Sequence, residues 1–136
     1  MMRNKRVLVS LLVAGITGCS TSSVVVTGAP VTGAWGGAHA SLSLTGAGGV
    51  ITYDCAHGGL SAPILPDGTG SFDVPGVHVR DRGGPVRMGD IPDSLPARYL
   101  GQVSGARMTL RVLAGADTLG PFALQLEAAP QLFRCL

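Results

Sequence analysis

The sequence has little charge, few aromatic side chains and a single lysine. Of its 136 residues, 13% are charged and 4% are aromatic, whereas 21 glycines and 9 prolines interrupt the chain. The lysine, Lys5, precedes residue 19, so the remainder has no lysine for a Schiff base or a phosphate-binding P-loop. The chain is too short for a Rossmann enzyme with a substrate domain, a TIM barrel or an α/β-hydrolase. With 46% hydrophobic residues it is also too apolar for a typical disordered tail.

The N-terminal segment combines basic residues with a short apolar run. Arg3, Lys5 and Arg6 precede the apolar stretch 7–16. As a helix at ~1.5 Å per residue, this stretch covers about half of a ~30 Å hydrocarbon core, which favours a signal peptide over a membrane span. The following Ile-Thr-Gly-Cys sequence, 16–19, resembles a bacterial lipobox. The resemblance implies that residues 1–18 are a lipoprotein signal peptide and that Cys19 is cleaved free and lipidated. The alternative is an ordinary secretory peptide.

Lipidation predicts a location in the cell envelope. Several acyl chains at Cys19, at ~0.8 kcal/mol per buried methylene, anchor a protein stably to a membrane. By the same resemblance, Ser20 implies the outer membrane if the cell has two membranes. Residues 19–32 then form the lipidated tether, and 33–136 a single β-domain. Cleavage leaves 7 arginines against 8 acidic residues, a formal charge of −1, so we expect no nucleic-acid partner.

Two cysteines remain if Cys19 carries lipid. In an oxidising compartment, Cys55 and Cys135 are expected to form a disulfide. The bond closes a loop of about 80 residues and contributes roughly 4.5 kcal/mol by loop entropy. Two reduced buried thiols or a metal site are the alternatives. Asp54 and His57 do not complete a recognised metal-ligand spacing with Cys55, so no metal is predicted.

Apolar and polar residues alternate along most of the chain after Gly33, which is typical of half-buried antiparallel strands. Glycine-rich turns separate about eight such segments, roughly ten residues apart. We predict an all-β fold, a small antiparallel up-and-down β-barrel or meander; a Greek-key β-sandwich is the alternative. The alternation places both paired cysteines on apolar faces, inside the barrel or at its seam. The segments are Leu42 and Leu44; Ile51, Tyr53 and Cys55; Phe72 and Val74; Val77 and Val79; Tyr99 and Val103; Met108, Leu110 and Val112; Phe122, Leu124 and Leu126; and Phe133 and Cys135.

One long connection, residues 81–96, contains three prolines and is predicted to be a loop. Arg80, Arg82 and Arg87 lie around its Gly-Gly-Pro turn. Their planar guanidinium groups can clamp a carboxylate or phosphate. Alternatively they pair with Asp81, Asp90 or Asp93 and stiffen the loop.

Other candidate functional residues are isolated. The segment 57–59, His-Gly-Gly, resembles an esterase oxyanion loop, but no Gly-x-Ser-x-Gly elbow accompanies it, so we interpret it as a turn. The three histidines, His39, His57 and His78, lie in different segments. Trp35 is interpreted as a plug at one barrel end, with ligand stacking as the alternative. No catalytic constellation or cofactor motif is found.

Six segments, taken together, resemble an uncharacterised family of small bacterial secreted lipoproteins. The resemblance covers most of the mature chain and implies one compact β-domain with a Cys55–Cys135 bond and no established activity. A Gly-x-Trp opening followed by a meander is also similar in architecture to lipocalins. The segments are Trp35-Gly36-Gly37, Asp54-Cys55-Ala56-His57-Gly58, Gly70-Ser71-Phe72, Arg82-Gly83-Gly84-Pro85-Val86-Arg87, Ala97-Arg98-Tyr99-Leu100-Gly101 and Cys135-Leu136.

These observations predict a lipid-anchored, non-catalytic β-barrel that binds or supports other envelope components. A hollow barrel favours a small apolar ligand, and a filled one favours contact with an envelope protein. A small hydrolase or anion-binding enzyme that uses His57 or His78 with the segment 80–87 is the first alternative. An inhibitor that presents the loop 81–96 is the second.

Overall fold

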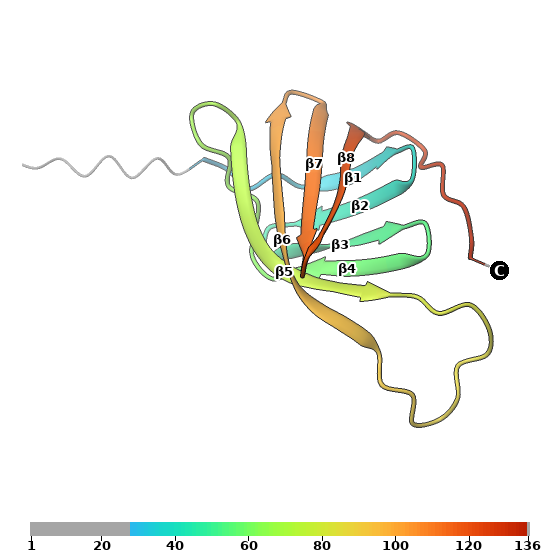
Figure 1. Cartoon of the computed structure of the whole chain (residues 1–136). Helices are drawn as coiled ribbons and strands as arrows, with labels where there is room; N and C mark the ends of the chain where they lie inside the picture. The colour runs from blue at the N-terminus through green and yellow to red at the C-terminus, as the bar shows by residue number, and fades with distance from the viewer. Residues whose placement is uncertain (1–27, 136) are drawn as a thin grey trace, which may run out of the picture.

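The computed structural model describes residues 28–135, which form a closed barrel of eight antiparallel strands and no helix (Figure 1). Every strand pairs with the next along the chain, and β8 returns to pair with β1. The up-and-down barrel is therefore confirmed and the Greek-key sandwich is excluded. None of the described segments is a helix long and apolar enough to span a membrane. The strands are β1 Gly33–Gly37, β2 Ala40–Thr45, β3 Gly48–Tyr53, β4 Ala56–Leu60, β5 Ser71–Arg80, β6 Asp93–Ser104, β7 Arg107–Ala114 and β8 Asp117–Leu126.

Two strands were not predicted from the alternation. Strands β1 (GAWGG) and β4 (AHGGL) contain so many glycines that too few side chains remain to show a period of two. The interpretation of residues 57–59 as a turn is wrong, because they pair with β3 on one side and β5 on the other. The predicted segments around Phe72 and Val77 are one continuous strand, β5.

The long loop is shorter than predicted. Residues 93–96 belong to β6 and pair with 77–80 of β5, so the loop comprises residues 81–92. Pairing between β6 and β7 begins only at Ala97. Pro96 therefore lies where β6 pairs with β5 alone, so its missing N–H removes no hydrogen bond to β7.

Side chains fill the interior of the barrel. Tyr99 is completely buried, and its hydroxyl donates a hydrogen bond to the carbonyl oxygen of Val77 at 2.7 Å. Inward-facing glycines make room for its ring: a Cβ at Gly58 would lie 2.2 Å from the Tyr99 hydroxyl, and one at Gly76 2.6 Å from Cε2. Aliphatic residues fill the remaining layers: Ala40, Leu42, Leu44, Ile51, Leu60, Val74, Ala97, Met108, Leu110, Val112, Ala114 and Leu124.

The two ends of the barrel differ. The chain enters β1 at one end, the tether end, where Val31 donates a backbone hydrogen bond to Ile64 and the buried Trp35 donates its indole N–H to Thr32. Because successive antiparallel strands reverse direction, the loop 81–92 lies at the opposite end, the loop end. Figure 1 shows this loop projecting from the barrel. Trp35 is buried at the tether end, as expected for a plug, and is not exposed for ligand stacking.

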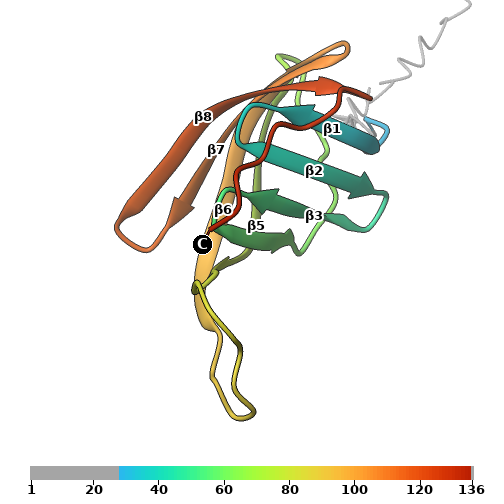
Figure 2. The same cartoon turned by 90° about the vertical axis from the view of Figure 1, so that its right-hand side faces the viewer.

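The C-terminal residues 127–135 form an extended segment, the strap, on the outside of the barrel. Figure 2 shows the strap passing from the end of β8 across the neighbouring strands. No strand is formed by Phe133 and Cys135, so that prediction is wrong; one isolated bridge joins Gln131 to Ala38. The strap ends at the Cys55–Cys135 disulfide, whose Cα atoms are 5.1 Å apart.

The disulfide lies outside the barrel, contrary to the expectation that it lies inside it or at its seam. Cys55 belongs to the two-residue turn between β3 and β4, where its φ is +62° and its side chain is exposed. Alternation therefore ends at Tyr53, two residues earlier than the sequence pattern indicates. The bond joins the strap to an exposed turn at the loop end.

We expect Gly58→Ala to lower the free energy of unfolding by about 1–3 kcal/mol, because the new methyl group overlaps Tyr99 in a filled interior. Urea denaturation measures this change. Gly59→Ala is the matched control, since its Cβ would meet its nearest atom at 3.7 Å, an ordinary contact. Equal effects of the two substitutions would contradict this account of the interior.

Candidate functional site at the loop end

A hollow of about 310 Å³ lies beneath the loop 81–92 at the outer wall of the barrel. His57 reaches it from β4, because the flanking Ala56 and Gly58 face inward. The His57 Nδ1 and Asp81 Oδ1 atoms are 2.7 Å apart, a hydrogen bond that joins the base of the loop to the barrel wall. Arg80 and Arg82 also line the hollow. The structure thus brings together three of the five residues predicted to contact a ligand.

The other two predicted contact residues lie elsewhere. Trp35 is buried in the barrel and bonded to Thr32, away from the hollow. Arg87 lies farther along the loop, where its backbone N–H donates to the Asp90 carboxylate at 3.0 Å and its carbonyl accepts from the Asp90 N–H at 3.1 Å. This pair of hydrogen bonds closes a tight turn at the loop tip.

Charge around the hollow is largely balanced. Arg80 forms ion pairs with Asp117 and, at 4.0 Å, with Asp93. Asp90 and Asp81 add further carboxylates to the lining. Within residues 28–135, Arg82 has no ion pair with an acidic side chain. The arrangement therefore matches the stiffening alternative for Arg80 more closely than a clamp of three free arginines.

His78 faces the interior rather than the hollow. It lies on β5 opposite Gly58, is 2% exposed, and its ring centroid is 5.6 Å from that of Tyr53. Within the described chain, neither its Nδ1 nor the Tyr53 hydroxyl has a hydrogen-bond partner. Burial, reinforced by the positive Arg80 and by His57, lowers the pKa of His78 below its ordinary value. Because His78 faces inward and His57 faces outward, the barrel wall separates the two side chains.

The loop presents three exposed apolar side chains, together called the apolar tip, that sequence reasoning missed. Val86, Met88 and Ile91 are 87%, 105% and 83% exposed. The signal was present in the sequence, because these residues stand among glycine, proline and charged residues in a segment predicted to be a loop. The arginine and aspartate residues of the same segment predict a charged contact instead.

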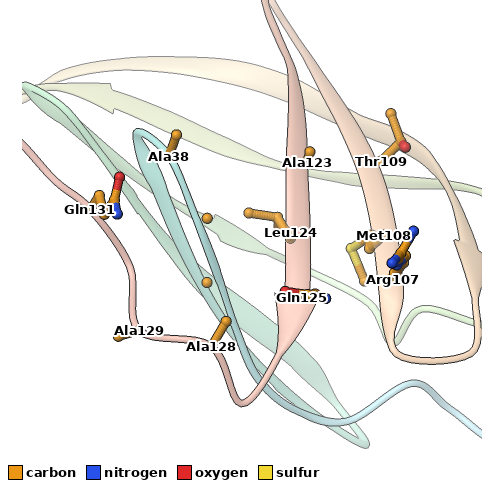
Figure 3. A pocket seen from close by; sticks show the side chains of 12 residues that line it. Ala38, Arg107, Met108, Thr109, Ala123, Leu124, Gln125, Ala128, Ala129 and Gln131 are labelled. Carbon is orange, nitrogen blue, oxygen red and sulfur yellow. The ribbon is translucent and has the colours of Figure 1, made fainter.

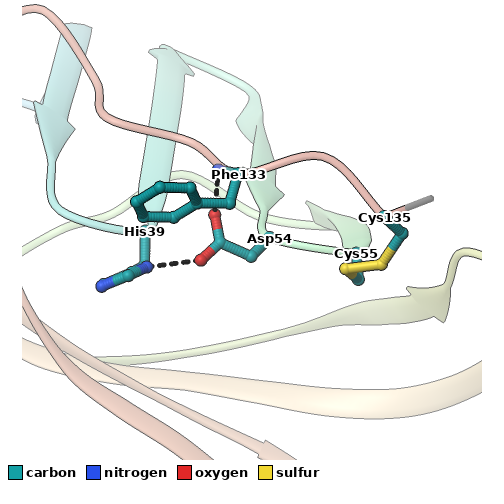
Figure 4. The surroundings of a disulfide bond; sticks show 5 residues. All are labelled: His39, Asp54, Cys55, Phe133 and Cys135. Carbon is teal, nitrogen blue, oxygen red and sulfur yellow. Dashed lines mark hydrogen bonds and ion pairs between the residues drawn. A yellow bond between two sulfur atoms is a disulfide. The ribbon is translucent and has the colours of Figure 1, made fainter.

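A second Asp–His pair joins the strap to the barrel (Figure 4). Asp54 accepts the Phe133 backbone N–H at 2.7 Å and pairs with His39 Nδ1, while the Phe133 ring lies 5.4 Å from that of His39. The Phe133 N–H and His39 together hold the pKa of the Asp54 carboxyl below its usual range. This contact and the disulfide are two separate attachments of the strap.

Among residues 28–135, no three His, Cys, Asp or Glu side chains come together in a way that could hold a metal ion. Comparisons with protein-family models, curated proteins and solved structures found no match for this chain.

We expect the free energy of unfolding to fall as pH decreases from about 7 to 5. The folded protein holds the pKa of His78 below its ordinary value of 6.5, so the unfolded chain binds this proton first. The slope reaches at most about 1.4 kcal/mol per pH unit for one proton. Asp54 and Asp67, whose pKa values are also lowered, act in a separate window below their ordinary 3.8. Chemical denaturation of the wild type and His78→Leu at several pH values measures the slope. The same slope in both proteins would contradict this assignment.

Proposed function

We propose that the protein is a lipid-anchored, non-catalytic module of the cell envelope that binds a partner protein through the loop 81–92. The observation that carries this proposal is the apolar tip, whose three large side chains are each more than 80% exposed. Burying an aliphatic or Met side chain of this size on binding contributes roughly 1.5–3 kcal/mol. Singly exposed apolar residues are common on protein surfaces, but three on one projecting loop favour an interaction site.

The loop is braced before it binds. The His57–Asp81 hydrogen bond supports its base, and the two hydrogen bonds between Arg87 and Asp90 close its tip. Pro85 restricts the backbone between these points, and Pro92 restricts it where the loop returns to β6. A pre-ordered loop loses less conformational entropy on binding, which raises the affinity that its apolar contacts can provide.

The charges of the loop favour a partner with an apolar pocket and an acidic rim. Asp81 and Asp90 turn back onto His57 and the loop backbone. Arg82 and Arg87 are exposed and, in the part of the chain that the structure describes, have no carboxylate partner. An inhibitor that inserts this loop into an enzyme cleft is one form of the same proposal.

The position of the loop favours a protein partner over the anchoring membrane. Cys19, the proposed lipid site, lies outside the described residues, but the chain enters the barrel at the tether end. The loop projects from the opposite end, so an N-terminal anchor directs the apolar tip away from its own membrane. The filled interior supports a function at the barrel surface.

A hydrolase or anion-binding enzyme is the second candidate. The His57–Asp81 pair favours it, because an aspartate that orients a histidine is part of many nucleophilic sites. However, within residues 28–135 the His57 ring has no hydrogen bond to a hydroxyl or thiol, and Arg80 already binds two carboxylates. We therefore assign the hollow a supporting role at the base of the loop.

The proposal is tested by placing a photo-crosslinking amino acid at position 88 in cells that produce the protein. We expect one discrete protein adduct from position 88, lost when Val86 and Ile91 are both changed to Ser. The crosslinker at Val50, 60% exposed on the barrel wall, is the control and should give no such adduct. The same adducts from both positions, or an adduct that survives the Ser changes, would contradict a binding role for the loop.

The anchor is tested separately by the intact mass of protein extracted from its native membrane. We expect a chain that begins at Cys19 and carries a diacylglyceryl group and an acyl group. Cys19→Ser should remove the lipid mass and release the protein from the membrane fraction. A wild-type protein without lipid would refute the anchor and leave the loop proposal to the crosslinking result.

A further inference from the structure

The seam between β1 and β8 is the narrowest pairing in the barrel. Three residue pairs join these strands, at Trp35–Leu126, Gly36–Gln125 and Gly37–Leu124, whereas the other neighbouring strands pair over at least five positions. Beyond Gly37, the backbone that follows β1 has no partner in β8, and the strap covers this open edge.

The strap binds this edge as an added strand would. Gln131 donates its N–H to the Gly37 carbonyl at 3.0 Å, and its own carbonyl accepts the His39 N–H at 2.8 Å. Near the start of the strap, Glu127 donates to the Ala34 carbonyl at 2.7 Å. Backbone pairing of this kind is the interaction by which an extended peptide adds to a sheet edge.

The sequence makes room for the strap at Gly36. A Cβ at this position would lie 2.1 Å from the Ala128 carbonyl oxygen and 2.9 Å from the Pro130 nitrogen. Its backbone has an ordinary negative φ, so the constraint is one of space and not of conformation. Gly36 therefore allows the close approach of the strap.

Few apolar contacts hold the strap in place. Leu132 and Phe133 remain 37% and 66% exposed, and every residue from 129 to 135 is exposed. The far half of the strap is retained by the Gln131 backbone pair, the Asp54–Phe133 contact and the disulfide. Both cysteines are exposed, so a dithiol reductant can reach the bond.

We propose that residues 127–135 are a redox-released strap that covers a strand-addition edge on β1. A thiolate of an external dithiol attacks one sulfur of the Cys55–Cys135 bond and forms a mixed disulfide. Its second thiolate then displaces that cysteine. Two electrons and two protons pass to Cys55 and Cys135, and the reductant becomes a disulfide.

Release of the strap exposes two features at once. The Gly37 carbonyl and the His39 N–H lose their partners, and a hollow of about 460 Å³ between β1 and β8 loses one wall (Figure 3). Met108 and Leu124 line the barrel side of this hollow, and Ala128, Ala129 and Gln131 line the strap side. In the oxidised protein, the occupant of this edge is the strap itself. This inference does not depend on the loop proposal, because the two surfaces share no residue.

Hydrogen exchange of the full-length protein, measured by mass spectrometry with and without a phosphine reductant, tests the strap. After reduction, we expect the amides of His39, Gln131 and Phe133, which lose their partners, to exchange at least about tenfold faster, while those of β5–β7 keep their rates. Unchanged rates in the strap would overturn the proposal, because non-covalent contacts would then suffice. Acceleration in all strands would overturn it as well, because the bond would then stabilise the whole barrel.

A second variant tests the same contact with the disulfide intact. Gly36→Ala should displace the strap and accelerate exchange at 128–133 in the oxidised protein, because its methyl group overlaps the Ala128 carbonyl. Gly59→Ala, whose Cβ meets nothing closer than 3.7 Å, is the matched control and should leave these rates unchanged. Wild-type rates in Gly36→Ala would show that the strap does not depend on this close approach and would refute its packing against β1.

Discussion

The fit of Tyr99 against inward-facing glycines is the constraint on which the rest of the structure depends. Its ring occupies the middle of the barrel only because Gly58 and Gly76 have no side chain there. The hydroxyl group of Tyr99 would be costly to bury unpaired, and the Val77 carbonyl accepts its hydrogen bond. With the ring in place, the interior is a packed core.

Because the interior is packed, the candidate functional features lie at the ends and on the outer wall of the barrel. The loop end contains the projecting loop, both exposed Asp–His pairs and the disulfide. Each of these features joins segments that lie far apart in the sequence: Asp81 braces the long loop on His57, and Asp54 holds Phe133 of the strap. The two histidine contacts thus act as supports for extended segments, one for each of the two surfaces proposed to matter.

Much of the fold was predictable because side-chain alternation is a local property. Strands β2, β3 and β7 alternate cleanly and were found from the sequence. Strand β5 was predicted as two segments, and the face predicted for Val77 is wrong, because Val77 is 40% exposed and its neighbour His78 is buried. Strands β1 and β4 were missed because glycine leaves no pattern to read. Pro96 made the first residues of β6, 93–96, resemble a loop, although a strand with one neighbour tolerates proline. The candidate site was predicted in part. The sequence identified His57, Arg80 and Arg82 as candidate residues, but it did not indicate that Arg80 is already paired or that the loop tip is apolar.

By itself, the sequence determined the all-β class, since this follows from local periodicity and short turns. It favoured the up-and-down order over a Greek key and the pairing of Cys55 with Cys135 over free thiols, and the structure confirms both. Only the tertiary structure decided which faces those residues occupy. The disulfide lies outside the barrel because one turn at Asp54 and Cys55 ends the alternation. His57 and His78 lie on opposite sides of one wall because the register of β4 and β5 pairs each with a different neighbour. Register, closure and the path of the strap depend on contacts between distant segments, and a linear pattern contains no information about those distances.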